Sequence, residues 1–193
     1  MNLTVFSSSS DAVDPLFFAV ARELGKTLAE RGDTLVYGGT DVGLMGALAH
    51  ATQDAGGKVI GVIPGHIAER RIAFEQADEL IVTPTLRERK AIMEERADAF
   101  VVLPGGFGTL EETVEIITLK QLQQHRKAIV ILNAHGFYDP LRVLFEHFYE
   151  QHFAKEASRA LYHFAGTVKD TFQYLDSYVP VAVPTKWVEA GKR

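Results

Sequence analysis

The sequence predicts an α/β protein, namely a Rossmann-like, doubly wound parallel sheet of about six or seven strands with helices on both faces. Short apolar runs alternate with amphipathic helical windows along the chain, which is the pattern of βαβ units. Of the 193 residues, 47% are hydrophobic, enough to cover both faces of a sheet. A glycine-rich turn at residues 104–109 also joins an apolar run to a helical segment, as in α/β proteins that bind anions.

The strands are expected at six apolar runs, residues 3–6, 34–37, 59–63, 80–82, 99–103 and 128–132. The connecting helices are expected at residues 15–31, 44–55, 86–97 and 113–123, with Asp14-Pro15 as a favourable start and Gly56-Gly57 as a stop. Beyond Asp139-Pro140 the chain is expected to be mostly helical. Residues 1–178 are predicted to form a single Rossmann-like domain, and 179–193 an irregular C-terminal tail on its surface.

The composition argues against several classes of protein. No cysteine is present, which excludes disulfides, thiolate metal sites and a cysteine nucleophile, and fits a reducing cytoplasm. No apolar run approaches the roughly 20 residues that span a bilayer, so we expect a cytoplasmic protein without a membrane partner. A net charge of −5 without a basic stripe argues against nucleic acid. The seven histidines show no ligand spacing, so we expect no metal and no cofactor.

The turn Pro104-Gly105-Gly106-Phe107-Gly108-Thr109 follows the apolar run 99–103 and precedes a helix. The first backbone N–H groups of a helix lack partners within the helix, and the helix dipole adds about half a positive charge there. Glycine lets a ligand approach the main chain closely. The loops 7–11 and 38–46 follow other strands, so the three should share one crevice. We therefore expect a phosphate in this crevice.

Glu112 follows Gly108 by about one helical turn, which would place a carboxylate beside the bound anion. Because that position is unfavourable for phosphate alone, Glu112 is predicted to act on another part of the ligand, such as a carbon that becomes cationic. In the simpler interpretation, Glu111 and Glu112 only favour the start of the helix through its dipole.

Four segments in register resemble the LONELY GUY family of cytokinin-activating phosphoribohydrolases, which are often labelled lysine decarboxylases. Residues 104–112 resemble its PGGxGTxxE signature, and Arg89-Lys90 with Met93 resembles its RKxxM segment. Tyr37-Gly38-Gly39 with residues 43–46 resembles its GGGxxGLMG loop, and residues 136–140 resemble its GYYDP turn. The resemblance covers roughly residues 2–150.

The resemblance implies hydrolysis of the N-glycosidic bond of a (cytokinin) nucleoside 5′-monophosphate to the free base and ribose 5-phosphate, without a cofactor. It implies a homodimer, with the helices 86–97 and 113–123 as candidate contacts. The implied catalytic residues are Arg89 and Glu112, although spacing alone would make the basic residues near Arg89 a solvated face. The implied substrate-binding residues are Ser8, Gly38, Gly39, Met45, Lys90, Gly105, Gly106, Phe107, Gly108, Thr109 and Leu110.

The chain departs from the family pattern at several positions. Thr40 replaces a third glycine, Ser7 and Ser8 replace Cys-Gly or Thr-Gly, Arg71 replaces a substrate-contacting Glu, and Leu119 replaces a common Trp. The phosphate end of the site is thus kept and the base end altered, so AMP or another purine nucleotide stays open as a substrate. A nucleoside monophosphate-binding protein without turnover is the alternative function, and lysine decarboxylation is the least supported. Dinucleotide and triphosphate motifs are incomplete or absent.

Overall fold

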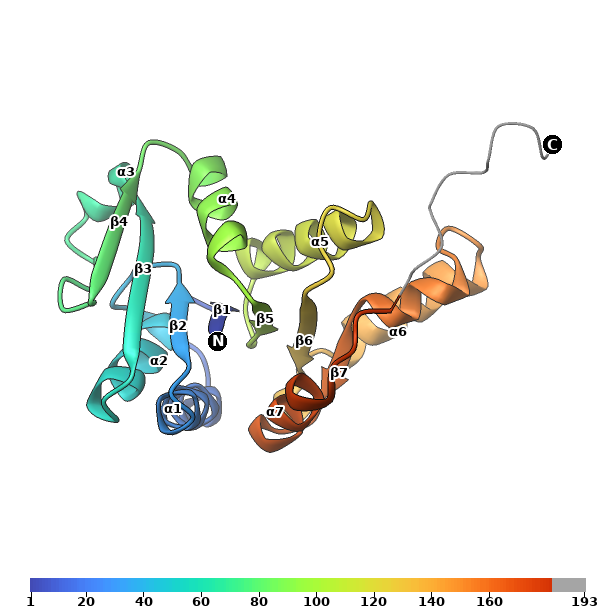
Figure 1. Ribbon diagram of the computed structural model, residues 1–193, viewed down its shortest axis with the longest axis horizontal. Coiled ribbons are helices and arrows are strands. Elements are labelled where there is room, and N and C mark those ends of the chain that lie inside the picture. The colour runs from blue at the N-terminus through green and yellow to red at the C-terminus, as the bar shows by residue number, and fades with distance from the viewer. Residues whose placement is uncertain (182–193) are drawn as a thin grey trace.

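The computed structural model describes residues 1–181. Its centre is one seven-stranded sheet, in which every neighbouring pair of strands is parallel (Figure 1). The strands are β1 (Asn2–Phe6), β2 (Thr34–Tyr37), β3 (Lys58–Pro64), β4 (Glu79–Thr83), β5 (Ala99–Val102), β6 (Ala128–Leu132) and β7 (His163–Ala165). The helices are α1 (Pro15–Glu30), α2 (Gly43–Asp54), α3 (Gly65–Ala68), α4 (Leu86–Arg96), α5 (Phe107–Gln121), α6 (Asp139–Glu150) and α7 (Val168–Ser177), with the 3-10 turns η1 (Ala134–Gly136) and η2 (Glu156–Leu161).

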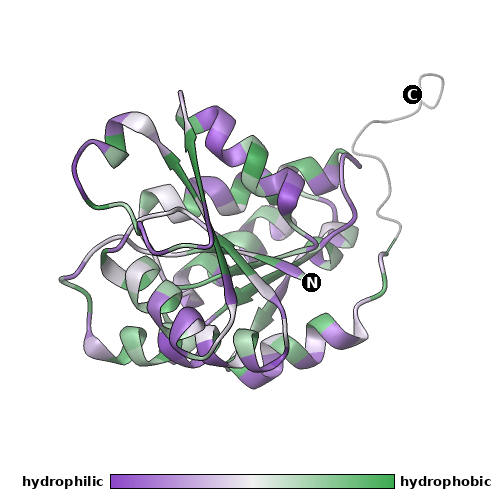
Figure 2. Ribbon diagram, turned by 60° about the vertical axis from the view of Figure 1, so that its left-hand side comes forward, coloured by the Kyte–Doolittle hydropathy of each residue, from purple (hydrophilic) through white to green (hydrophobic). Residues whose placement is uncertain are grey.

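Helices cover both faces of the sheet, which confirms the predicted fold class. One core contains Leu3 and Val5 of β1 together with buried residues of α1, α2 and α7. The other contains Phe6 of β1 with residues of α4, α5 and α6. Successive side chains of a strand point to opposite faces, so strands with a core on each side must be apolar throughout. Figure 2 shows this, since the central strands are largely hydrophobic and the helices carry hydrophilic residues outward.

The strand order is β4-β3-β2-β1-β5-β6-β7. The chain builds outward from β1 to β4, and then β5 returns to pair with the other side of β1. The connections that follow β1 and β5 therefore leave the sheet in opposite directions, which opens a crevice at the carboxyl ends of these strands. The backbone N–H of Ser8 donates to Pro104 O across this point, at 3.2 Å.

Two elements differ from the sequence prediction. Helix α5 begins at Phe107 rather than at residue 113, because the glycines themselves form its first turn and Leu110 N donates to Gly106 O at 3.0 Å. Strand β7 falls in a segment expected to be mostly helical. Its three residues are too few to show a period, and pairing with β6 makes them a strand.

The predicted C-terminal tail starts just after α7, and its residues 182–193 lie outside the described part of the chain. Within residues 1–181, no helix has both the length and the apolar character needed to cross a membrane.

Candidate active site

A cavity of about 610 Å³ lies over the carboxyl ends of the central strands, and we call it the front cavity. Segments that follow β1, β2, β3 and β5 contribute to it, as does α4. It is lined by residues 7–10, Gly38, Thr40, Met45, His66, Ile67, Arg70, Ile72, Arg89, residues 106–109 and Glu112. The three loops predicted to share a crevice therefore do meet.

Arg89 and Glu112 form a buried ion pair in this cavity. Arg89 Nη1 donates to Glu112 Oε1 at 2.7 Å, and Arg89 Nε donates to Val62 O at 3.0 Å. The two residues are 8% and 5% exposed. A Cβ at position 38 would lie 2.2 Å from Arg89 Nη2, so Gly38 leaves the space through which the guanidinium reaches Glu112. The pair therefore joins α4 to α5, and the bond to Val62 O ties it to β3.

Burial raises the pKa of the Glu112 carboxyl, since removal from water disfavours its charged form. The charge and hydrogen bond of Arg89 act in the opposite direction. Arginine stays protonated in proteins, so Arg89 can orient a group or stabilise charge but cannot shuttle a proton. Glu112 can stabilise a positive charge and can also transfer a proton. A carboxyl with a raised pKa is typical of acid-base sites.

The N-terminus of α5 opens into the same cavity. Gly106, its N-cap, has no side chain to bond the first-turn N–H groups. A Cβ at Gly106 or Gly108 would meet no atom within 4 Å, so packing of the chain does not require glycine at either position. By contrast, a Cβ at Gly105 would lie 2.1 Å from Thr109 Oγ1. Open space around Gly106 and Gly108 beside free amides suits a phosphate oxygen.

The serine loop after β1 forms the facing wall. Ser7 is 2% exposed, and its Oγ has no hydrogen-bond partner among residues 1–181. The loop is held in place because Ser8 O accepts from Met45 N at 3.3 Å and Asp11 Oδ1 accepts from Gly43 N at 2.8 Å. A buried hydroxyl without a partner costs free energy unless a ligand or water bonds to it. Ser7 is therefore a further candidate ligand of the substrate.

The end of the cavity near β3 is built by residues that the sequence analysis did not select, namely His66, Ile67, Arg70 and Ile72. β3 and β5 are separated by three strand spacings, or about 14 Å. That separation leaves room for a ribose and a base beyond a phosphate at α5. Pro64-Gly65, which ends an apolar run, was a usable signal for this loop. Arg71 has φ +58° and is exposed outside the cavity lining, whereas Arg70 lines it.

Most residues selected from the sequence line the front cavity, but four do not: Gly39, Lys90, Gly105 and Leu110. Gly39 has φ +75° and lies against β3, where its O accepts from Phe74 N at 2.9 Å. Gly105 shapes the turn next to Thr109, and Leu110 is half-buried in α5. Among the departures from the family pattern, Thr40 Oγ1 donates to Met45 Sδ at 3.2 Å.

Lys90 points to a second, smaller cavity of about 170 Å³ on the other side of Glu112, which we call the rear cavity. It is lined by Phe6, Arg87, Lys90, Ala91, Glu94, Glu112, Glu115, Ile116 and Leu119. Lys90 Nζ forms ion pairs with Glu111 and, at 2.9 Å, with Glu115. Consecutive residues of a helix point about 100° apart, so Lys90 and Arg89 face different cavities.

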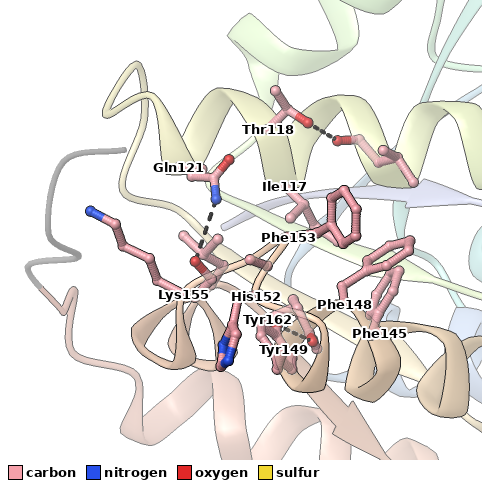
Figure 3. A pocket seen from close by; sticks show the side chains of 14 residues that line it. Ile117, Thr118, Gln121, Phe145, Phe148, Tyr149, His152, Phe153, Lys155 and Tyr162 are labelled. Carbon is pink, nitrogen blue, oxygen red and sulfur yellow. Dashed lines mark hydrogen bonds between the residues drawn. The ribbon is translucent and has the colours of Figure 1, made fainter. Parts of the chain in front are cut away.

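A third hollow, an apolar groove of about 470 Å³, runs between α5, α6 and η2 (Figure 3). Phe145, Phe148 and Phe153 gather on one side of it, and Ile117, Thr118 and Gln121 of α5 lie on the other. Phe153 is 88% exposed. Phe148 is also exposed, whereas Phe145 is buried at the base of the groove. Exposed apolar side chains that lie together are typical of interaction surfaces.

Within residues 1–181, no group of three His, Asp or Glu side chains is placed to hold a metal ion. The fold and the front cavity together define a Rossmann-like α/β protein that has the open N-terminus of α5 and a buried arginine–carboxylate pair at its topological switch point.

Comparisons with known proteins agree with this class. Residues 45–175 match the family model described as "Possible lysine decarboxylase". The chain is 42% identical over 178 residues to the cytokinin riboside 5′-monophosphate phosphoribohydrolase LOG of Oryza sativa subsp. japonica, covering 92% of this chain and 74% of that one. It is 40% identical to LOG2 of Arabidopsis thaliana, covering 92% and 84%. The chain belongs to the LONELY GUY family.

Solved structures show the same fold. The molybdenum cofactor carrier protein of Chlamydomonas reinhardtii matches with a TM-score of 0.69 at 24% identity, over 91% of this chain and 95% of that one. The molybdenum cofactor binding protein of Rippkaea orientalis matches with a TM-score of 0.70 at 22% identity, over 91% and 95%.

Proposed function

We propose that this protein hydrolyses the N-glycosidic bond of a nucleoside 5′-monophosphate to a free base and ribose 5-phosphate. The observation that carries the proposal is the buried Arg89–Glu112 pair, which lies one helical turn past the open N-terminus of α5 in a single cavity. The phosphoribohydrolase names of the 42% and 40% identical relatives support the same reaction.

The phosphate binds the first-turn amides of α5 at Gly106, Phe107, Gly108 and Thr109, with Ser7 and Ser8 facing it. It acts as a remote handle whose binding energy positions the ribose. C1′ then lies by Glu112, and the base extends toward β3, between Met45 and the α3 segment.

Bond cleavage gives C1′ oxocarbenium character, which the Glu112 carboxylate stabilises. Water attacks C1′ as the bond from C1′ to the base nitrogen breaks. Glu112 accepts a proton from this water and returns it to the departing base, so protons balance over a turnover. Arg89 holds Glu112 in place, and its positive charge favours the carboxylate form, opposite to the effect of burial on the Glu112 pKa.

Cytokinin nucleotides are the first substrates to test, because the relatives are named for them. AMP and other purine monophosphates come next, because Arg71 stands where the resemblance leads us to expect Glu. A binding protein without turnover is the alternative function, and the relatives' hydrolase names do not favour it. Lysine decarboxylation is disfavoured, because no lysine is among the described residues that line the front cavity to form a Schiff base.

The test is incubation with AMP and with isopentenyladenosine monophosphate, with chromatography for the free base and a thermal-shift titration alongside. Glu112→Gln should abolish base release and keep the stabilisation by nucleotide. Glu23→Gln, on the exposed side of α1, is the control and should keep both. Stabilisation of the unmodified protein without release from any nucleotide would instead support the binding protein.

We further propose that the protein is a cytoplasmic homodimer with no nucleic-acid partner, and that the apolar groove of α5, α6 and η2 forms the dimer contact. Helix α5 carries the phosphate site at its start and the groove along its length, which couples dimer contact to the active site. Phe153→Asp should convert the dimer to a monomer in light scattering. Leu16→Asp, on exposed α1, should not, and a monomeric unmodified protein would contradict this proposal.

A further inference from the structure

Lys90 follows Arg89 in α4, and Glu111 precedes Glu112 in α5, and three ion pairs join the two helices. Arg89 and Glu112 form the front, buried pair. Lys90 with Glu111 and Glu115 forms the rear cluster, in which the Lys90 side chain is 17% exposed. Glu112 lines both the front and the rear cavity, so it is the wall that the two pairs share.

We propose that Lys90 is a positioning residue for Glu112, which it holds and polarises from the rear cavity through Glu111 and Glu115, and not a ligand of the nucleotide. Three observations carry this inference, which rests on the proposed function. Lys90 lies outside the front-cavity lining, its ammonium bonds two carboxylates of α5, and those carboxylates lie one residue before and three residues after Glu112.

The charges around Glu112 make the position of Lys90 important. Helix α4 presents Arg87, Arg89, Lys90 and Glu94 to it, while α5 adds Glu111 and Glu115. His66 and Arg70 face it from the front cavity. Without Lys90, Glu111 and Glu115 would have no ion-pair partner among residues 1–181.

The direction of each effect follows from Coulomb's law. The positive charge of Lys90 favours the ionised form of Glu112 and lowers its pKa, whereas the negative charge of Glu111 raises it. Hydrolysis needs the carboxylate, so the rate falls as the pH falls through the pKa of Glu112. We call the low-pH part of the pH–rate profile, where the rate falls, the acid limb. Removing Lys90 should therefore move the acid limb to higher pH, and neutralising Glu111 should move it to lower pH.

The experiment measures kcat/KM for base release against pH, because this ratio reports the ionisation of the free enzyme. Lys90→Met should raise the midpoint of the acid limb by about half to one pH unit, and Glu111→Gln should lower it by a similar amount. Lys90→Arg, which keeps the charge, should restore the midpoint. KM should change less than about threefold in Lys90→Met, since no substrate contact is lost.

The matched control is Lys26→Met. Lys26 pairs with Glu30 at 3.6 Å on the surface of α1, which packs on the opposite face of the sheet from α4 and α5, so its loss should leave the midpoint in place. A KM raised tenfold or more by Lys90→Met, with an unmoved limb, would make Lys90 a substrate ligand and overturn the inference. The inference would also be overturned if the midpoints of the acid limb moved in the same direction in Lys90→Met and in Glu111→Gln.

A second measurement does not depend on turnover. Carbon NMR of labelled glutamate follows the Glu112 carboxyl directly through a pH titration, with Glu112→Gln used to assign the signal. The same opposite shifts are expected in Lys90→Met and Glu111→Gln. If no nucleotide is hydrolysed, the proposed function fails, while this titration still decides the role of Lys90.

Discussion

Asp11 Oδ1 accepts a hydrogen bond from the backbone N–H of Gly43 at 2.8 Å, which fastens the loop after β1 to the first residue of α2. A Cβ on Gly43 would lie 2.4 Å from the backbone carbon of Ser9, and Gly43 has φ +61°. The wall of the front cavity therefore depends on a close approach of two backbones that only glycine permits.

Gly43→Ala should accordingly destabilise the protein by more than backbone strain alone. Gly56 supplies the comparison, because it has φ +78° but open space around its Cβ position. We expect Gly56→Ala to cost about 1 kcal/mol, and Gly43→Ala about 1–3 kcal/mol more. Urea unfolding of the two variants measures the difference, and equal losses would mean that the approach to Ser9 relaxes freely.

Gly108→Ala separates ligand binding from folding. A Cβ there meets no atom within 4 Å, and alanine favours a helix by up to about 1 kcal/mol over glycine. The free energy of unfolding should therefore stay level or rise, while the Kd for ribose 5-phosphate rises at least about tenfold, because the methyl group occupies space beside the phosphate. Calorimetric titration measures binding, and an unchanged Kd would place the phosphate elsewhere.

Removal of Arg89 should leave Glu112 buried without its partner. Arg89→Met is expected to cost about 3–5 kcal/mol of unfolding free energy, the usual effect of breaking a buried ion pair. The double variant Arg89→Met with Glu112→Met should recover a large part of that loss. A double-mutant cycle by chemical denaturation checks this, and strictly additive losses would argue against the coupling.

Lys120 should make stability depend on pH. It is 4% exposed, its Nζ donates to Leu161 O at 2.8 Å, and burial lowers its pKa to about 8 from 10.5. Between these values the unfolded chain binds more protons than the folded protein, so the free energy of unfolding should rise as the pH increases from 8 to 10.5.

Lys120→Met should remove that rise, by about 1–3 kcal/mol, and should not destabilise the protein strongly at pH 7. Urea unfolding at several pH values measures the difference between the two proteins. A difference that stays constant across this range would show that Lys120 titrates normally.

Much of the site was readable from residue order. The alternation of apolar runs and helical windows predicted the parallel sheet, and the glycine-rich turn was correctly placed at the start of a helix that opens into the front cavity, because both depend on local backbone geometry. Binding of an anion at that turn stays a prediction. Arg89 and Glu112 were selected together, and the structure brings them to 2.7 Å. Their catalytic roles stay predictions.

The tertiary structure decided which neighbouring residues face the substrate. Lys90 was grouped with Arg89, yet it pairs with Glu111 and Glu115 behind the site. His66 and Arg70 line the cavity from the segment after β3, for which the Pro64-Gly65 break marked a turn but not a binding role. Strand β7 and the apolar groove of α5, α6 and η2 likewise follow from pairing and packing between distant segments. Helix rotation and strand order determine which faces meet, and neither is encoded in a period of a few residues.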